Sequence, residues 1–211
     1  MTKRLPFLLV ALLSTRAAQA QAWNYPAFQP PRIESREFNF ALADAGSAGT
    51  TVLVQWRELA GRRSQFTLEA GLVAPDFGDN ILALGAGYAY EAHRSTPDVP
   101  LDVVLTAGAG LGLGRSTTIR VPIGASLGYR FELEKNVALT PYVHPRLSAD
   151  ICNNCRRNDD LGFGINFDIG ANLDVTRALA LRAAALFGGG DLFSQNGLGI
   201  SLAWRPPGLR R

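Results

Sequence analysis

The sequence predicts an all-β fold, an antiparallel up-and-down β-barrel of ten strands that crosses a membrane. Large apolar residues alternate with small or polar ones over most of the chain, which is the period-two pattern of strands. Many of these runs span about 9 to 14 residues, the length of a tilted strand that crosses a bilayer. The 22 Gly and 12 Pro residues disfavour helices and suit turns and barrel bends.

The composition excludes several other classes of protein. A chain of 211 residues is long enough for one domain with a substantial core. Apolar residues make up 47% and charged residues 18%, which is too apolar for disorder and too charged for a bundle of membrane helices. The formal net charge is +3, but without Lys3, Arg4 and Arg16, in a segment that we expect to be removed, 18 basic residues face 18 acidic ones. A balanced charge gives no reason to expect nucleic-acid binding.

Residues 1–22 have the layout of a secretory signal peptide. Lys3 and Arg4 precede an apolar run, and small residues follow at Ala18, Ala20 and Ala22. The apolar run is about nine residues long, well short of the roughly 20 that a membrane-spanning helix needs. We therefore expect cleavage after Ala20 or Ala22.

The rest of the chain divides into three parts. Residues 23–35 include Pro26, Pro30 and Pro31 and predict an extended periplasmic lead-in. Residues 36–205 carry the alternating runs and predict the barrel, and residues 206–211 form a C-terminal tail. The predicted strands cover residues 36–44, 51–59, 65–73, 80–91, 101–113, 118–131, 137–148, 161–174, 178–187 and 197–205.

The two faces of these strands favour a membrane barrel. Leu82 and Leu84 share one face of their run, for example, while Gly85 and Gly87 share the other. A soluble barrel points its apolar face inward, and its outer face is rarely so rich in Gly. A membrane barrel points the apolar face to lipid and lines a narrow lumen with small and polar residues and paired charges. The predicted lumen charge network consists of Glu69, Glu91, Asp102, Arg120, Arg130, Arg146 and Asp168.

The connections between strands agree with an even strand number and with both termini in the periplasm. Short turns alternate imperfectly with longer loops, of which the longest spans residues 150–160. A barrel of eight strands is the alternative, if the first hairpin or one weak pair lies outside it. Aromatic residues near strand ends predict girdles at the membrane interfaces. They are Tyr88, Tyr90, Tyr129, Phe131, Phe187 and Trp204.

Several features together resemble a known group of membrane proteins. They are the signal peptide, the turns at residues 133–136 and 174–177, and the final strand from Leu198 to Trp204. With the alternating strands, they resemble the small outer-membrane β-barrel superfamily that includes OmpA-like, OmpX-like and OmpW-like proteins. The resemblance implies a bacterial outer-membrane location and insertion by the barrel assembly machinery. Members usually end on an aromatic residue, whereas here Trp204 is followed by a further tail.

Cys152 and Cys155 lie in the longest polar loop, and an oxidising compartment favours a disulfide between them. A redox site of the thioredoxin type needs C-x-x-C at a helix N-terminus, and zinc needs four ligands, with His144 the nearest histidine. Free or intermolecular thiols are further alternatives. We expect a structural disulfide, no metal and no cofactor.

The two histidines are the only candidates for a general base near neutral pH. His93 and Ser95 form an H-x-S spacing similar to that of outer-membrane lipid A deacylases. However, His93 falls on the periplasmic side of the predicted topology, and residues 101–114 offer no Glu to orient it. We interpret His93 as a turn residue and His144 as a hydrogen-bonded residue of the lumen face.

The glycines from Gly108 to Gly114 recur at every second residue. A phosphate-binding loop leads into a helix, and no helical pattern follows these glycines. We therefore interpret the run as a lumen-facing strip of small residues and do not expect nucleotide binding.

The sequence predicts a location more clearly than an activity. We expect a non-enzymatic outer-membrane barrel, in contact with outer-membrane lipid, that is either structural or a narrow porin-like conduit for small solutes. A soluble periplasmic lipocalin-like binder is one alternative, and it requires the apolar face to point inward. A lipid-modifying barrel enzyme is the other, and it requires a nucleophile and a base clustered at the outer rim.

Overall fold

The structure is a computed structural model that describes residues 25–44, 49–76, 78–153, 161–192 and 195–206. No helix in these ranges is long and apolar enough to cross a membrane. The regular elements within them are strands. They are β1 (Arg36–Asp44), β2 (Thr50–Leu59), β3 (Ser64–Ala74), β4 (Ile81–His93), β5 (Asp102–Leu113), β6 (Thr117–Gly128), β7 (Phe131–Glu134), β8 (Val137–Asn153), β9 (Leu161–Asp174), β10 (Leu179–Gly190) and β11 (Gln195–Trp204).

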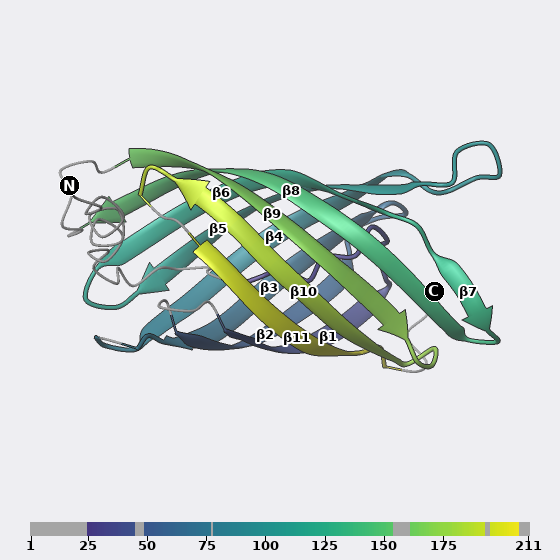
Figure 1. Cartoon of the computed structure of the whole chain (residues 1–211), viewed down its shortest axis with the longest axis horizontal. Helices are drawn as coiled ribbons and strands as arrows, with labels where there is room; N and C mark the ends of the chain where they lie inside the picture. The colour runs from purple at the N-terminus through teal and green to yellow at the C-terminus, as the bar shows by residue number, and fades with distance from the viewer. Residues whose placement is uncertain (1–24, 45–48, 77, 154–160, 193–194, 207–211) are drawn as a thin grey trace, which may run out of the picture.

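Ten of these strands close into one antiparallel barrel (Figure 1). Consecutive strands pair from β1 to β6 and from β8 to β11, while β1 pairs with β11 and β6 pairs with β8. The closing register runs from Phe38 opposite Trp204 to Asp44 opposite Leu198. Closure pairs the edges that an open sheet would leave free. The prediction of a ten-stranded barrel is therefore confirmed, and eight strands are excluded.

Several strands differ in length from the prediction, among them the sixth and the seventh. The sixth was expected to continue to residue 131, but β6 ends at Gly128, and Phe131–Glu134 form the short β7 beside β8. Asn136 closes the turn between β7 and β8 with a φ of 72°, a left-handed conformation that Asn tolerates. The seventh was expected to end at residue 148, whereas β8 continues to Asn153, which pairs with Thr117 of β6.

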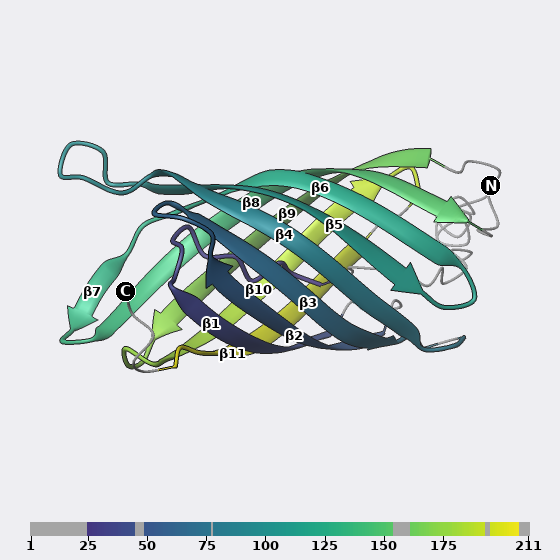
Figure 2. The same ribbon diagram turned by 180° about the vertical axis from the view of Figure 1, so that it is seen from behind.

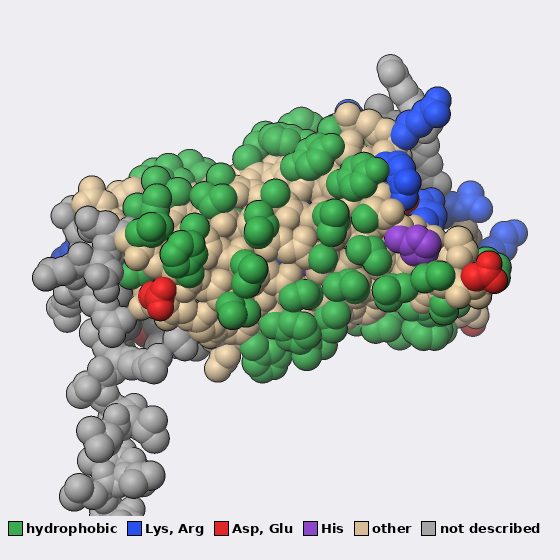
Figure 3. Space-filling model, turned by 90° about the horizontal axis from the view of Figure 1, so that it is seen from above, with side chains coloured by type: hydrophobic (Ala, Val, Ile, Leu, Met, Phe, Trp, Pro, Cys, Tyr) green, Lys and Arg blue, Asp and Glu red, His purple; other side chains and the backbone are tan. Residues whose placement is uncertain are grey.

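The outer surface of the barrel is apolar along its middle (Figure 3). Large apolar side chains point outward from the wall strands, and Val52, Ile123 and Ile165 are 57%, 56% and 66% exposed. Charged side chains gather toward the ends in the same view. Such a belt suits the hydrocarbon core of a bilayer, as the sequence predicted. The lipocalin-like alternative requires these side chains to point inward, and they do not.

Residues 25–35, which we call the internal segment, lie inside the barrel (Figure 2). Tyr25, Phe28 and Gln29 are buried, at 3%, 0% and 6% exposure. Ser35 leads into β1, and its carbonyl accepts a hydrogen bond from Leu59. The sequence predicted a periplasmic lead-in here. The structure places the segment in the lumen instead, because wall residues without large side chains leave a space that close packing fills.

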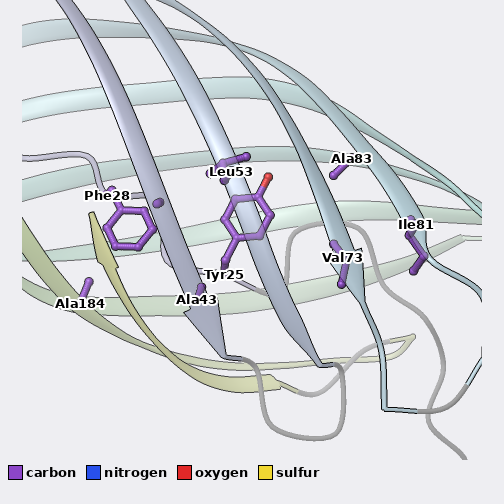
Figure 4. Packing of buried hydrophobic residues seen from close by; sticks show 9 residues of the cluster. Tyr25, Phe28, Ala43, Leu53, Val73, Ile81, Ala83 and Ala184 are labelled. Atoms are coloured by element: carbon purple, nitrogen blue, oxygen red, sulfur yellow. The ribbon is translucent and has the colours of Figure 1, made fainter. Parts of the chain in front are cut away.

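An apolar cluster holds one end of the internal segment. Tyr25 and Phe28 pack against small and aliphatic side chains of the wall (Figure 4). Gly199 of β11 makes room for them, because a Cβ there would lie 2.6 Å from the Phe28 ring. The wall is therefore shaped around this ring. The wall members of the cluster are Ala41, Ala43, Leu53, Val73, Ile81, Ala83 and Ala184.

The apolar belt predicts the effect of a charge placed on it. We expect Ile123→Arg, near the middle of β6, to lower the free energy of unfolding by about 2–4 kcal/mol, because the arginine then faces the bilayer midplane. Leu133→Arg on β7, outside the wall strands, is the control and should change it by no more than about 0.5 kcal/mol. Urea unfolding in lipid vesicles measures both. Equal effects would contradict the membrane orientation.

Candidate functional site in the lumen

Arg57 of β2 holds the backbone of the internal segment. Its Nη2 donates hydrogen bonds to the carbonyl oxygens of Ala27 and Phe28, at 3.2 and 3.0 Å, and to Oε1 of Gln55 at 3.0 Å. Phe28 has a φ of 49°, which bulky residues rarely adopt. We attribute this strained conformation to the two successive carbonyl groups that face one guanidinium.

Asp168 of β9 holds the same stretch of the segment. The backbone N–H of Ala27 donates to Oδ2 of Asp168 at 3.0 Å. Arg146 of β8 donates to the other carboxylate oxygen at 2.7 Å, and Nδ1 of His144 lies 3.6 Å from Oδ2. Asp168 is fully buried, at 0% exposure. These donors replace the hydration that a buried carboxylate loses.

A third group of contacts surrounds Glu37 of β1. Its carboxylate accepts hydrogen bonds from Arg182 at 2.7 and 2.6 Å, and it lies 3.2 Å from Arg57 and 3.2 Å from Arg205. Glu37, Arg57 and Arg182 are all nearly inaccessible, at 1%, 2% and 2% exposure. Arg205 also donates to Asp174 at 2.9 Å. The Glu37 cluster therefore ties together β1, β2, β10 and the residue that follows β11.

Four further side-chain contacts run along the internal segment. Each joins it to β3, β5 or β6, so that the segment is held from several sides. It is therefore a part of the folded barrel. The contacts are Tyr25 to Glu69 (3.3 Å), Ser126 to the Gln29 carbonyl (2.7 Å), Arg32 to Asp102 (2.7 Å) and Gln65 to the Glu34 carbonyl (2.9 Å).

Glu34 and Arg205 lie outside the membrane-spanning strands. Glu34 comes just before the start of β1, and Arg205 follows the end of β11. Burial raises the pKa of Glu34, although the guanidinium of Arg205, 3.6 Å away, acts in the opposite direction. Burial also opposes the charge of Arg205, but Glu34, Glu37 and Asp174 together raise the pKa of Arg205. Arg205 therefore remains a cation and supplies a fixed positive charge to the Glu37 cluster.

A cavity of about 90 Å³ lies between the internal segment and the wall formed by β2–β6 and β8. Arg57, Glu69, His144 and Arg146 are among the side chains that line it. Gly87 of β4 also lines it, and a Cβ there would meet its neighbours at an ordinary 3.7 Å. Packing does not demand a glycine at this position. Its missing side chain leaves the space open.

Thr106, His144 and Asp168 form a row beside the cavity. Oγ1 of Thr106 lies 2.9 Å from Nε2 of His144, whose Nδ1 faces Asp168 at 3.6 Å. A hydroxyl, an imidazole and a carboxylate in this order resemble a nucleophile, a base and an orienting acid. The row lies near the middle of β8, however, and a lipid-modifying enzyme would need it at the rim. Asp168 is also engaged by Arg146 and by the segment, so we interpret the row as positioning of His144.

The seven predicted lumen charges do not form a single network. Among them, Arg146 and Asp168 pair with each other, and the others interact with residues outside the predicted set. A side chain reaches the segment or a strand at most two places away in the wall, so charges spread along the barrel form separate groups. The other interactions are Arg32–Asp102, Arg94–Glu91, Arg120–Asp150, Arg130 with Asp174 and Glu132, and Glu69 with Tyr25 and Gln55.

The sequence prediction leaves out the residues at the centre of the site. Glu37, Arg57 and Arg182 are absent from the predicted network, although the alternation of their strands indicates a lumen position. Arg57, for example, shares a predicted face with Gln55. Arg32 gives no such signal, because it precedes the first strand, where no alternation applies.

Of the other motifs, Gly108 of the glycine run lines the cavity, whereas His93, Ser95 and Cys152 do not. His93 is the last residue of β4, and Ser95 accepts a hydrogen bond from Arg32 at 3.2 Å. Cys152 is buried near the end of β8 and is disulfide-bonded. Cys155 lies outside the described residues, so the predicted pairing of the two cysteines stays a prediction. Across the described ranges, no group of three or more His, Cys, Asp or Glu side chains is placed to hold a metal ion.

Comparisons with known proteins show a structural likeness and no family. No family model and no curated protein matches the sequence. The β-domain of the Bordetella autotransporter Brka is 9% identical, covers 81% of this chain and 98% of its own, and has a TM-score of 0.48. The KdgM porin in complex with disordered oligogalacturonate is 10% identical, covers 82% and 99%, and has a TM-score of 0.38. The fold therefore rests on its own strand pairing, and the resemblance to OmpA-like, OmpX-like and OmpW-like proteins stays a prediction.

The Glu37 cluster predicts an unequal response to loss of two glutamates. We expect Glu37→Gln to lower the free energy of unfolding by about 3–5 kcal/mol, because it leaves buried guanidinium groups without their shared anion. Glu58→Gln is the matched control, since Glu58 pairs with Arg36 where its side chain is 31% exposed, and we expect a loss of no more than about 1 kcal/mol. Urea titration followed by gel mobility measures both losses. Similar losses would show that the cluster has no special role.

Proposed function

We propose that this protein is an outer-membrane barrel that forms a narrow conduit for small solutes, and that the internal segment closes it. The observation that carries the proposal is the set of hydrogen bonds from Arg57, Asp168 and Ser126 to the backbone of the segment. A barrel of about this size can be filled permanently by side chains of its own wall. Here the internal segment occupies the lumen and is held by hydrogen bonds. Water and solute can form the same hydrogen bonds with the wall when the segment leaves.

The lumen lining supports a conduit over a purely structural barrel. Asn39 of β1, Gln55 and Arg57 of β2 and Arg182 of β10 are polar or charged, face the lumen and are buried. Buried ion pairs are often no better for stability than well-packed apolar residues. If the segment withdrew, water would hydrate these side chains, as it does in open barrels. The apolar cluster around Phe28 favours the closed state.

We also infer an outer-membrane location with lipid around the apolar belt and insertion by the barrel assembly machinery. The closed barrel, its apolar surface and the signal-peptide layout of residues 1–22 support this part of the proposal. The proposal assigns no catalytic residue and no cofactor. Solute passage requires only that the segment leave the lumen.

Removal of the segment tests the conduit. We expect the wild-type protein to be silent in planar lipid bilayers, and a variant without residues 23–33 to show stepwise conductance, because the deletion removes the contacts to Arg57, Asp168 and Ser126. A synthetic peptide of residues 23–33 should then reduce the current. A heat-dependent shift in gel mobility shows that each variant is a folded barrel.

Two further variants keep the test decisive. A deletion of the tail, residues 206–211, is the matched truncation and should leave the bilayer silent. If the 23–33 deletion does not fold, Phe28→Ala weakens packing of the segment by about 3–5 kcal/mol and should produce brief openings. Folded variants that lack the segment and still conduct nothing would refute the conduit.

Export predicts a definite N-terminus for the mature protein. We expect the chain purified from the outer-membrane fraction to begin at Gln21 or Trp23, because cleavage follows Ala20 or Ala22. N-terminal sequencing and intact mass measure this directly. A protein that still begins at Met1, or one recovered with soluble periplasmic contents, would overturn the proposed location.

A further inference from the structure

We infer that the cavity beside the internal segment binds a small zwitterion, a solute the size of glycine or alanine that carries one ammonium and one carboxylate group. The inference rests on the proposed function, because it assigns a class of ligand to the same lumen. It is carried by the groups that line the cavity and by the space between them.

Glu69 of β3 supplies the negative side of the cavity. Its carboxylate accepts hydrogen bonds from Nε2 of Gln55 at 2.7 Å and from the hydroxyl of Tyr25 at 3.3 Å. Both donors are neutral, and Glu69 forms no ion pair with any residue that the structure describes. Glu69 is half-buried, and its hydrogen bonds from neutral donors are weaker than charge-assisted ones, which are about twice as strong. An ammonium group in the cavity would supply the missing cation.

Arg57 and Arg146 supply the positive side. Both line the cavity and are buried, at 2% and 8% exposure. In each guanidinium, the Nε atom has no hydrogen-bond partner among the described residues, although Nη1 of Arg57 donates to Glu37 and Nη2 of Arg146 donates to Asp168. A buried donor left unpaired costs roughly 1–3 kcal/mol. A ligand carboxylate beside these two residues would lie close to both positive charges.

The two signs of charge favour a zwitterion over a simple ion. A cation bound at Glu69 would face the guanidinium groups of Arg57 and Arg146 across the same small space. An anion bound at the arginines would face Glu69. Like charges held close together in a poorly hydrated site repel strongly. A solute with both charges places each against its opposite and adds no net charge to the lumen.

The space sets the size of the ligand. A cavity needs about 10–15 Å³ of free space to hold one water-sized group. The cavity of about 90 Å³ therefore holds roughly six such groups. Glycine and alanine have about this number of non-hydrogen atoms. Gly87 keeps the space open although a side chain would fit without a clash. An amino acid with a side chain larger than that of alanine has more atoms than this space holds.

Binding is tested on the full mature protein in lipid nanodiscs by titration calorimetry with glycine, methylammonium and acetate. The last two probes each carry one of the two charges of glycine. We expect glycine to bind in the millimolar range, and each single ion to bind at least about tenfold more weakly, since a charged hydrogen bond contributes about 1.5–3 kcal/mol. Acetate or methylammonium that binds as tightly as glycine would overturn the assignment to a zwitterion.

Three variants locate the site. Glu69→Gln keeps the shape of the side chain, removes its charge and should weaken glycine binding about tenfold. Gly87→Leu fills the cavity and should abolish binding. Gly189→Leu is the matched control, since a Cβ at Gly189 of β10 meets nothing within 4 Å, and it should bind like the wild type. Glycine binding that survives both Glu69→Gln and Gly87→Leu in folded barrels would place the ligand elsewhere and refute the inference.

These measurements separate the inference from the proposed function, because they use the closed protein and record no current. If the variant without residues 23–33 conducts but the wild-type protein binds no glycine, the conduit stands and the inference fails. If glycine binds in the expected pattern but the segment deletion conducts nothing, the binding site stands and the conduit fails.

Discussion

The barrel depends on the balance between the carboxylate of Glu37 and the guanidinium groups that surround it. Each of these charges loses several kcal/mol of hydration on burial, and only their mutual contacts compensate for that loss. The contacts form only when β1 lies between β2 and β11 in its observed register. A slip of one residue would turn Glu37 to lipid and Phe38 into the lumen. The cluster therefore selects the register in which the barrel closes.

The guanidinium groups of the lumen have more N–H donors than the wall has acceptors for them. This excess explains why a stretch of backbone lies in the lumen. Arg57 has more N–H groups than Glu37 and Gln55 can satisfy, and its Nη2 also donates to the carbonyls of Ala27 and Phe28. The internal segment is suited to this wall, because Pro26, Pro30 and Pro31 have carbonyls but no N–H groups. A proline-rich segment thus brings acceptors into an arginine-rich lumen with few donors of its own to satisfy.

Alternation along the chain was enough to predict the ten strands, their outward apolar face and closure, because each strand in a membrane barrel faces lipid on one side and the lumen on the other. The pairs within the lumen were harder to predict, since they depend on register between strands far apart in sequence, as for Glu37 and Arg182. The location of residues 25–35 was missed for another reason. Prolines restrict local backbone conformation and say nothing about which side of a membrane, or of a barrel wall, the chain occupies.

Two glycines in the wall differ in whether packing requires them. One lies against a filled part of the lumen, and the other lies beside the cavity. Gly199 is compelled by packing, because any side chain would collide with the Phe28 ring. Gly87 has no such neighbour, and an alanine would fit there. A barrel that required only a tight interior would gain stability by filling this position, at roughly 25 cal/mol for each Å² of apolar surface buried. The space that Gly87 leaves open lies beside Glu69, Arg57 and Arg146, where the proposed ligand would meet charges of both signs.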